Sequence, residues 1–128
     1  MAGTTSGVIF KKVGTDLNIT QYQGKTVNFD VIWGGSAPED VTGYSAKMQA
    51  RKGVTSTEVL LEFNSVSGAD GLITVGTTDG KFTFSMPAVD SAAITPFCGV
   101  YDFEITSAAG VVVLVFSGRF EFLAEVTK

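Results

Sequence analysis

The residues of this chain that could do chemistry are carboxylates on predicted strands, because the 128-residue sequence contains no His. Asp102 and Glu104 stand two positions apart, so they project from the same face of a strand. Glu58 and Glu62, four positions apart, are expected to share a face in the same way. Glycosidases use two carboxylates at a fixed separation. Without His, however, the chain lacks the commonest general base and the commonest metal ligand. Charge on a solvated strand face, which discourages edge-to-edge association, accounts for both pairs, and we expect no enzymatic activity.

The remaining candidates for chemistry are one cysteine and two acidic turns. Cys98 is the single cysteine, so an intrachain disulfide is excluded, which fits folding in a reducing cytoplasm. A Cys98 nucleophile would have no His to activate it, and we expect a small buried side chain. Asp70 and Asp79 precede glycines and could ligate Ca²⁺, but their spacing is not that of a calcium loop. Turn geometry explains both, so we predict no metal and no cofactor.

Short strands must position these groups. Apolar and polar residues alternate in residues 27–33, 44–51, 100–106 and 120–124, and glycine-rich turns separate them. The two Asp-Gly dipeptides have alternating flanks and indicate hairpin-like connections. Only residues 88–94 have helical character, enough for one turn between strands. Eight or nine short strands with almost no helix predict an all-β, immunoglobulin-like antiparallel β-sandwich.

The length predicts one domain, with residues 1–13 as a short N-terminal arm and residues 14–128 as the β-sandwich. Residues 111–116 are apolar on both faces, which indicates a central strand or one covered by a partner. Together with the apolar part of the arm and the end of the chain, this strand supplies the predicted partner contacts. They are Val8, Ile9, Phe10, Val112, Leu114, Phe116 and Leu123.

Composition narrows the classes of partner. The net charge is −4 and no cluster of Lys or Arg occurs, so we expect no nucleic-acid binding. No apolar stretch approaches the roughly 20 residues of a membrane-spanning helix, and the first residues lack a secretory-signal pattern. Charged residues make up 17% of the chain, below the typical ~25%, which leaves neutral surface for assembly with other proteins.

Five segments in a particular order carry a resemblance to a known family. They are ITQYQGKT at 19–26, VTGYSAKMQAR at 41–51, GKFTFSMP at 80–87, YDFEI at 101–105 and GRF at 118–120. This pattern, which covers most of residues 17–123, resembles the immunoglobulin-like N-terminal domain of tailed-phage baseplate upper proteins and related tail-fibre-associated proteins. No catalytic residues accompany the resemblance. Baseplate upper proteins continue into long C-terminal regions, whereas this chain ends soon after the expected sandwich.

The resemblance implies a virion protein, made in the host cytoplasm, that docks fibres or receptor-binding proteins to the tail, baseplate or collar. Its partners would be other virion structural proteins, including further copies of itself. A capsid decoration, or cement, protein of the same fold is one alternative. A carbohydrate-binding sandwich, in which Trp33, Tyr44 and Tyr101 stack on sugars, is a second. A small hydrolase using Asp102 and Glu104 is a third.

Overall fold

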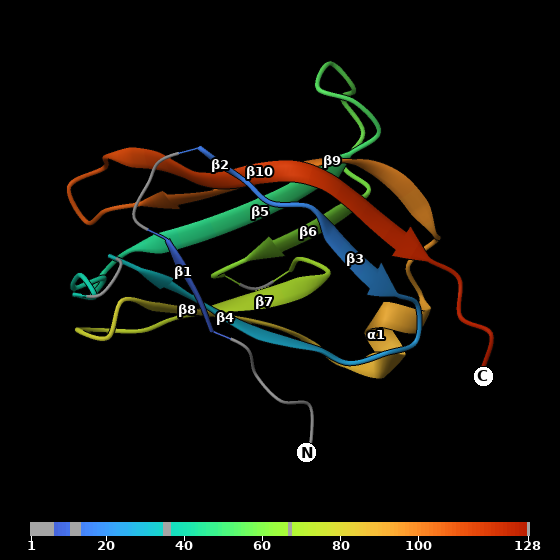
Figure 1. The fold of residues 1–128 in the computed structure, drawn as a ribbon, viewed down its shortest axis with the longest axis horizontal. Coiled ribbons are helices and arrows are strands. Elements are labelled where there is room, and N and C mark those ends of the chain that lie inside the picture. The colour runs from blue at the N-terminus through green and yellow to red at the C-terminus, as the bar shows by residue number, and fades with distance from the viewer. Residues whose placement is uncertain (1–6, 11–13, 35–36, 67, 128) are drawn as a thin grey trace.

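The computed structural model describes residues 14–34, 37–66 and 68–127, and the backbone of residues 7–10. Ten strands and one short helix make up this part of the chain (Figure 1). In chain order they are β1 (Gly7–Phe10), β2 (Thr15–Asp16), β3 (Ile19–Tyr22), β4 (Val27–Trp33), β5 (Ser45–Arg51), β6 (Leu61–Asn64), β7 (Gly71–Val75), β8 (Lys81–Met86), α1 (Ala88–Ala92), β9 (Phe97–Thr106) and β10 (Val112–Leu123). The predicted β-rich class and the helical turn after Pro87 are therefore confirmed.

The strands form one mixed sheet that curls into a half-barrel. Their order is β1-β4-β8-β7-β6-β5-β9-β10-β2, and β3 also pairs with β10. β1 pairs parallel with β4, β6 with β7, and both β2 and β3 with β10. The prediction of a purely antiparallel sheet is therefore wrong. Alternation along a strand shows which face is buried, but it does not show which neighbour the strand pairs with or in which direction.

The first strands lie at opposite edges of this sheet, although few residues separate them. β1 pairs with β4 at one edge, while β2 pairs with β10 at the other. The four positions 11–14 join them, so the two edges lie within about 18 Å of each other. Part of the predicted arm, residues 7–10, is thus paired into the sheet as β1. Residues 1–6 and 11–13 lie outside the described part of the chain.

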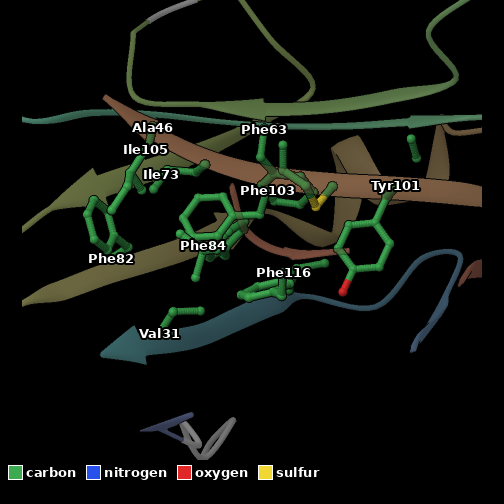
Figure 2. Packing of buried hydrophobic residues seen from close by; sticks show 14 of the residues in the cluster. Val31, Ala46, Phe63, Ile73, Phe82, Phe84, Tyr101, Phe103, Ile105 and Phe116 are labelled. Atoms are coloured by element: carbon green, nitrogen blue, oxygen red, sulfur yellow. The ribbon is translucent and has the colours of Figure 1, made fainter. Parts of the chain in front are cut away.

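The core lies inside the curl and is built largely from aromatic rings (Figure 2). The Phe84 ring lies 5.0 Å from that of Phe103, which lies 5.1 Å from Phe116. These rings come from β8, β9 and β10, so they join strands that are not all neighbours in the sheet. Most positions predicted to face inward in four strands are buried, although Phe29 and Tyr44 are half-buried and Ala124 is exposed. The buried positions include Val27, Val31, Trp33, Ala46, Met48, Ala50, Tyr101, Phe103, Ile105, Phe120 and Phe122.

The two Asp-Gly dipeptides have different structural roles. Asp79-Gly80 forms the predicted hairpin between β7 and β8, with Gly80 at φ +64°. The hairpin prediction for Asp70-Gly71 is wrong, because β6 and β7 run parallel there. The Asp70 carboxylate instead accepts a hydrogen bond from the Glu62 backbone N–H at 2.9 Å. Gly71 lies so close to Phe63 that a Cβ would meet its ring at 2.3 Å, and its missing side chain makes room for the ring.

Candidate functional site

An open groove lies on the outer face of the sheet, across β5, β9 and β10. Its volume is about 1000 Å³. The alternation that buries one side of each strand points the other side into this groove. Three cationic side chains (Lys47, Arg51 and Arg119) and three anionic ones (Asp16, Asp102 and Glu104) line it, so the lining is electrically balanced. The other lining residues are Asn18, Gln49, Gly53, Val54, Ser56, Val100, Tyr101, Leu114, Ser117 and Gly118.

An acidic row crosses the outer face through the middle of the groove. The register places Asp16 opposite Ser117, Ser117 opposite Asp102, Asp102 opposite Gln49, and Gln49 opposite Glu62. Gln49 Nε2 donates to the Glu62 carboxylate at 2.8 Å. Asp102 is exposed, in the centre of the row. This row therefore presents carboxylates from three strands along one line.

A basic row lies beside the acidic one. It places Arg119 of β10 opposite Val100 of β9, and Val100 opposite Arg51 of β5. The Arg119 side chain is 64% exposed, and its guanidinium lies 4.0 Å from the Glu121 carboxylate. A surface ion pair at that distance contributes little to stability, so Arg119 remains free to engage another charge.

Arg51 also shapes one end of the groove, where the chain leaves β5. Its Nη1 donates to the carbonyl oxygens of Ser56 at 3.1 Å and Thr57 at 2.6 Å. The Ser56 hydroxyl in turn accepts from the Gly53 N–H at 3.2 Å. These bonds fix a loop that projects beyond the strands (Figure 1). The loop carries Val54, whose exposed fraction is 89%, so a structured loop holds an apolar side chain in solvent.

The opposite end of the groove is also apolar, and two predicted partner contacts lie here: Leu114 lines the groove and Val112 lies just beyond it on β10. Val112 is 58% exposed and Leu114 is 36% exposed. A β-bulge follows Leu114, because Leu114 pairs with Glu104 and Phe116 pairs with the adjacent Phe103. The bulge breaks the alternation of β10. The bulge explains why residues 111–116 look apolar on both faces of the strand. Leu114, before the bulge, is exposed, whereas Val115 and Phe116 are buried.

The other predicted contact residues are less available. Phe116 is fully buried at 0% exposure, because the bulge turns it toward the core, so its prediction as a partner contact is wrong. Leu123 is half-buried and ends β10, where its carbonyl accepts from the Gln23 N–H at 2.8 Å. Val8, Ile9 and Phe10 belong to β1, but their side chains lie outside the described part of the structure.

The titratable groups with shifted pKa values have structural roles. Burial raises the pKa of the Tyr101 phenol, and the nearby Asp16 carboxylate raises it further. The Tyr101 hydroxyl donates to the Leu17 carbonyl at 2.5 Å, which ties β9 to the segment between β2 and β3. Hydrogen bonds from the Thr77 and Lys81 backbone lower the pKa of Asp79, which is consistent with its role in the turn.

The carboxylates singled out as possible catalysts lie in an open setting. Asp102 is exposed and Glu104 is half-buried, both on the outer face of β9. A general acid of the glycosidase type needs an enclosed apolar environment, which this face does not provide. Within the described ranges, no group of three or more His, Cys, Asp or Glu side chains is arranged to hold a metal ion. Cys98 is exposed, contrary to expectation, because it occupies an outward position opposite Glu121.

The aromatic residues proposed for sugar stacking do not share an exposed surface. Trp33 and Tyr101 are buried in the core, and Tyr44 is half-buried against it. The feature that would have favoured a carbohydrate-binding module is therefore missing at these three positions.

Comparison with models of known protein families and with curated protein sequences found no match to this chain. No helix in the described ranges is long and apolar enough to cross a membrane. The assignment of function consequently depends on the groove and on the sequence pattern.

The sequence alone indicated that Lys47, Gln49 and Arg51 share a solvated face, but not that this face lines a groove. The missing information was the pairing order that brings β5, β9 and β10 together. The signal that could have drawn attention to it is opposite charge on alternating positions of three strands: Arg51, Asp102 and Arg119.

Proposed function

We propose that the chain is a non-enzymatic structural protein of a tailed-phage virion, which docks neighbouring virion proteins such as fibres in the tail, baseplate or collar. The location in a virion rests on the sequence pattern in residues 19–120. The mode of action rests on the groove, and this is the observation that carries the proposal. A broad open surface with balanced charge and apolar ends suits recognition of another protein surface better than chemistry on a small molecule.

We also propose that the curled sheet is a variant of the immunoglobulin-like sandwich. In the described part of the chain, strand pairing joins its two halves through two residue pairs, Phe63 with Gly71 and Asn64 with Leu72. Without that short bridge, β1-β4-β8-β7 would form one layer and β6-β5-β9-β10-β2 the other. In immunoglobulin terms these layers would correspond to strands ABED and to strands built around CFG. The contact between Phe84 of β8 and Phe103 of β9 joins the two proposed layers.

The test is to locate the chain in particles. Particles from cells that carry the gene would be purified, and their proteins quantified by mass spectrometry beside a non-structural phage enzyme as the control. We expect the chain to co-purify with particles in a fixed ratio to the tail proteins, while the enzyme is depleted. Loss of the chain together with the enzyme would overturn the proposal.

A capsid decoration protein is the second candidate, because it would use the same kind of surface. Gold-labelled antibodies against the chain separate the two locations. Label at the tail, baseplate or collar supports the proposal, whereas label spread over the head would assign the chain to the capsid.

A further inference from the structure

We infer that the outer face of β5, β9 and β10 binds the same face of a second copy of this chain, related by a two-fold axis. The inference rests on the proposed function in one respect, that the chain works by docking, and it names one partner. A two-fold interface brings one patch against itself, so the patch must be complementary to its own rotated image. The charge pattern on this face meets that requirement.

The axis that satisfies the pattern lies in the plane between the two stacked faces and runs across the strands. It crosses β9 midway between Val100 and Asp102, so the acidic row lies on one side of it and the basic row on the other. Rotation about this axis lays each strand antiparallel over the same strand of the second copy. The acidic row of each copy then lies over the basic row of the other.

The register shows which side chains would meet at the β10 side of the interface. Arg119 is two positions beyond Ser117 on β10, so each residue lies over the other after the rotation. Ser117 stands in its row between Asp102 of β9 and Asp16 of β2. Arg119 of one copy is therefore placed between two carboxylates of the other, and both of those residues are exposed.

The β5 side of the interface repeats the arrangement. Arg51 is two positions beyond Gln49, which stands in its row between Asp102 of β9 and Glu62 of β6. Arg51 of one copy thus lies over Gln49 of the other, again between two carboxylates. An axis parallel to the strands would instead set Asp102 against its own copy and Arg51 against Arg119. Like charges would then meet, so the charge pattern selects the axis that crosses the strands.

The rows next to these two carry fewer charges. One pair of like charges becomes neighbouring there, because Glu104 of one copy lies beside Glu121 of the other, and Glu121 is itself within 4.0 Å of Arg119. After the same rotation Glu104 lies over Cys98, the next outward position beyond Val100 on β9. The start of the loop after β5, Gly53 and Val54, lies over Lys47. The long aliphatic stem of Lys47 can cover an apolar side chain while its ammonium stays in solvent. This contact would account for the 89% exposure of Val54 in the isolated chain.

The size of the face is adequate for such a dimer. Five strands and the four outward rows described above span at most about 24 Å by 27 Å, from the usual strand spacing and rise. That is about 650 Å² in plan, close to the ~800 Å² per partner of a standard interface. An interface of ~800 Å² takes roughly a tenth of the 6996 Å² surface of the chain.

The test uses charge reversal and mixing. Light scattering of the wild-type protein should give twice the 13.4 kDa mass of the chain. Arg119→Glu alone and Asp102→Arg alone should each raise the dissociation constant about tenfold or more, because each sets like charges opposite each other. A mixture of the two variants should dimerise more tightly than either variant alone, although less tightly than the wild type, because Arg51 of one chain still lies beside the reversed charge at position 102 of the other. In the mixed dimer the reversed charge at position 119 of one chain faces the reversed charge at position 102 of the other, and the wild-type pair remains on the second side.

Asp90→Arg is the matched control, because Asp90 is exposed on α1, away from the groove. It should leave the dimer intact. Asp16→Arg replaces Asp102→Arg in the mixing test if the latter fails to fold, and Arg119→Gln replaces Arg119→Glu as a milder single change. A monomeric wild type, dimers that tolerate both single changes, or a mixture that associates no more tightly than the single variants would each overturn the inference. The dimer test and the particle test have independent outcomes. If the chain is absent from particles, the proposed function fails, but recovery of the dimer by the mixed variants would still support the inferred interface.

Discussion

The two faces of β5, β9 and β10 are made from alternating residues of the same strands, yet each is built for a different task. On the inner face, Met48, Phe103 and Phe116 lie in one cross-strand row and are all buried. On the outer face, the neighbouring row holds Gln49, Asp102 and Ser117, which reach the groove. The comparison shows that moving one position along a strand replaces a buried core residue with one that lines the open groove.

The largest effect on stability is expected from Phe103→Ala, at the centre of the inner face. Phe103 is fully buried and contacts the rings of Phe82, Phe84 and Phe116. Truncation should lower the free energy of unfolding by about 3–5 kcal/mol, since it removes buried area and leaves a cavity. Urea denaturation measures the change, with Phe103→Leu as a milder control. A loss below about 1 kcal/mol would contradict the packing described here.

Two glycine substitutions compare a packed turn with an open one. Gly80 has φ +64°, and an added Cβ would lie 2.5 Å from the Trp33 carbonyl oxygen. Gly110 has φ +88° at the exposed hairpin tip, with nothing within 4 Å of such a Cβ. Gly110→Ala should cost about 1 kcal/mol from backbone conformation alone, and Gly80→Ala about 2 kcal/mol or more. Thermal unfolding of both variants tests this order, and equal losses would argue against the close contact at Gly80.

Tyr101→Phe tests an inner residue whose polar tip reaches the edge of the sheet. Loss of the hydrogen bond to Leu17 should cost about 0.5–1.5 kcal/mol at neutral pH. Because the folded-state pKa of Tyr101 is raised, wild-type stability should fall as pH rises above about 10, where the unfolded chain loses the proton first. Unfolding curves across alkaline pH should show a smaller decline for the variant. An identical decline in both proteins would contradict burial of the phenol.

The smallest effect on stability is expected on the outer face. Arg119 is 64% exposed, so Arg119→Ala should change the free energy of unfolding by no more than about 0.5 kcal/mol. The same variant should weaken the inferred dimer, because Arg119 would lie between two carboxylates of the second copy. Lys25→Ala is the control, since Lys25 is an exposed cation between β3 and β4, outside the inferred interface. Urea denaturation and light scattering on one preparation measure both quantities. If Arg119→Ala instead caused a large loss of stability and left association unchanged, the outer face would contribute to folding and not to the dimer, contrary to the inference.

The sequence was sufficient to predict the buried face of most strands, because alternation in residues such as Ala46, Met48 and Ala50 is a local property. It failed where pairing between distant segments decides the outcome. At Gly71 the chain makes a parallel bridge to β6, and the Asp70 carboxylate accepts a hydrogen bond from that strand; no local turn rule contains either contact. The burial of Phe116 depends on a bulge in a strand that otherwise looks uniformly apolar.

The candidate site was predicted only in part for the same reason. Val112 and Leu114 were recognised as apolar residues without a place in the alternation, and the structure leaves both exposed. The charged rows were visible as solvated positions on single strands. That these positions form an acidic row and a basic row becomes evident only when β5, β9 and β10 are paired, because a row depends on the register between strands.

The parallel pairing of β3 with β10 has a consequence for synthesis of the chain. Thr20 and Glu121, which face each other in this pairing, are 101 positions apart in the sequence. At the usual pace of about 5–20 residues per second, β3 is made about 5–20 s before its partner exists. During that interval the segment of β3 has no strand to pair with on the ribosome-bound chain. The sheet can be completed only when β10, the last strand, emerges.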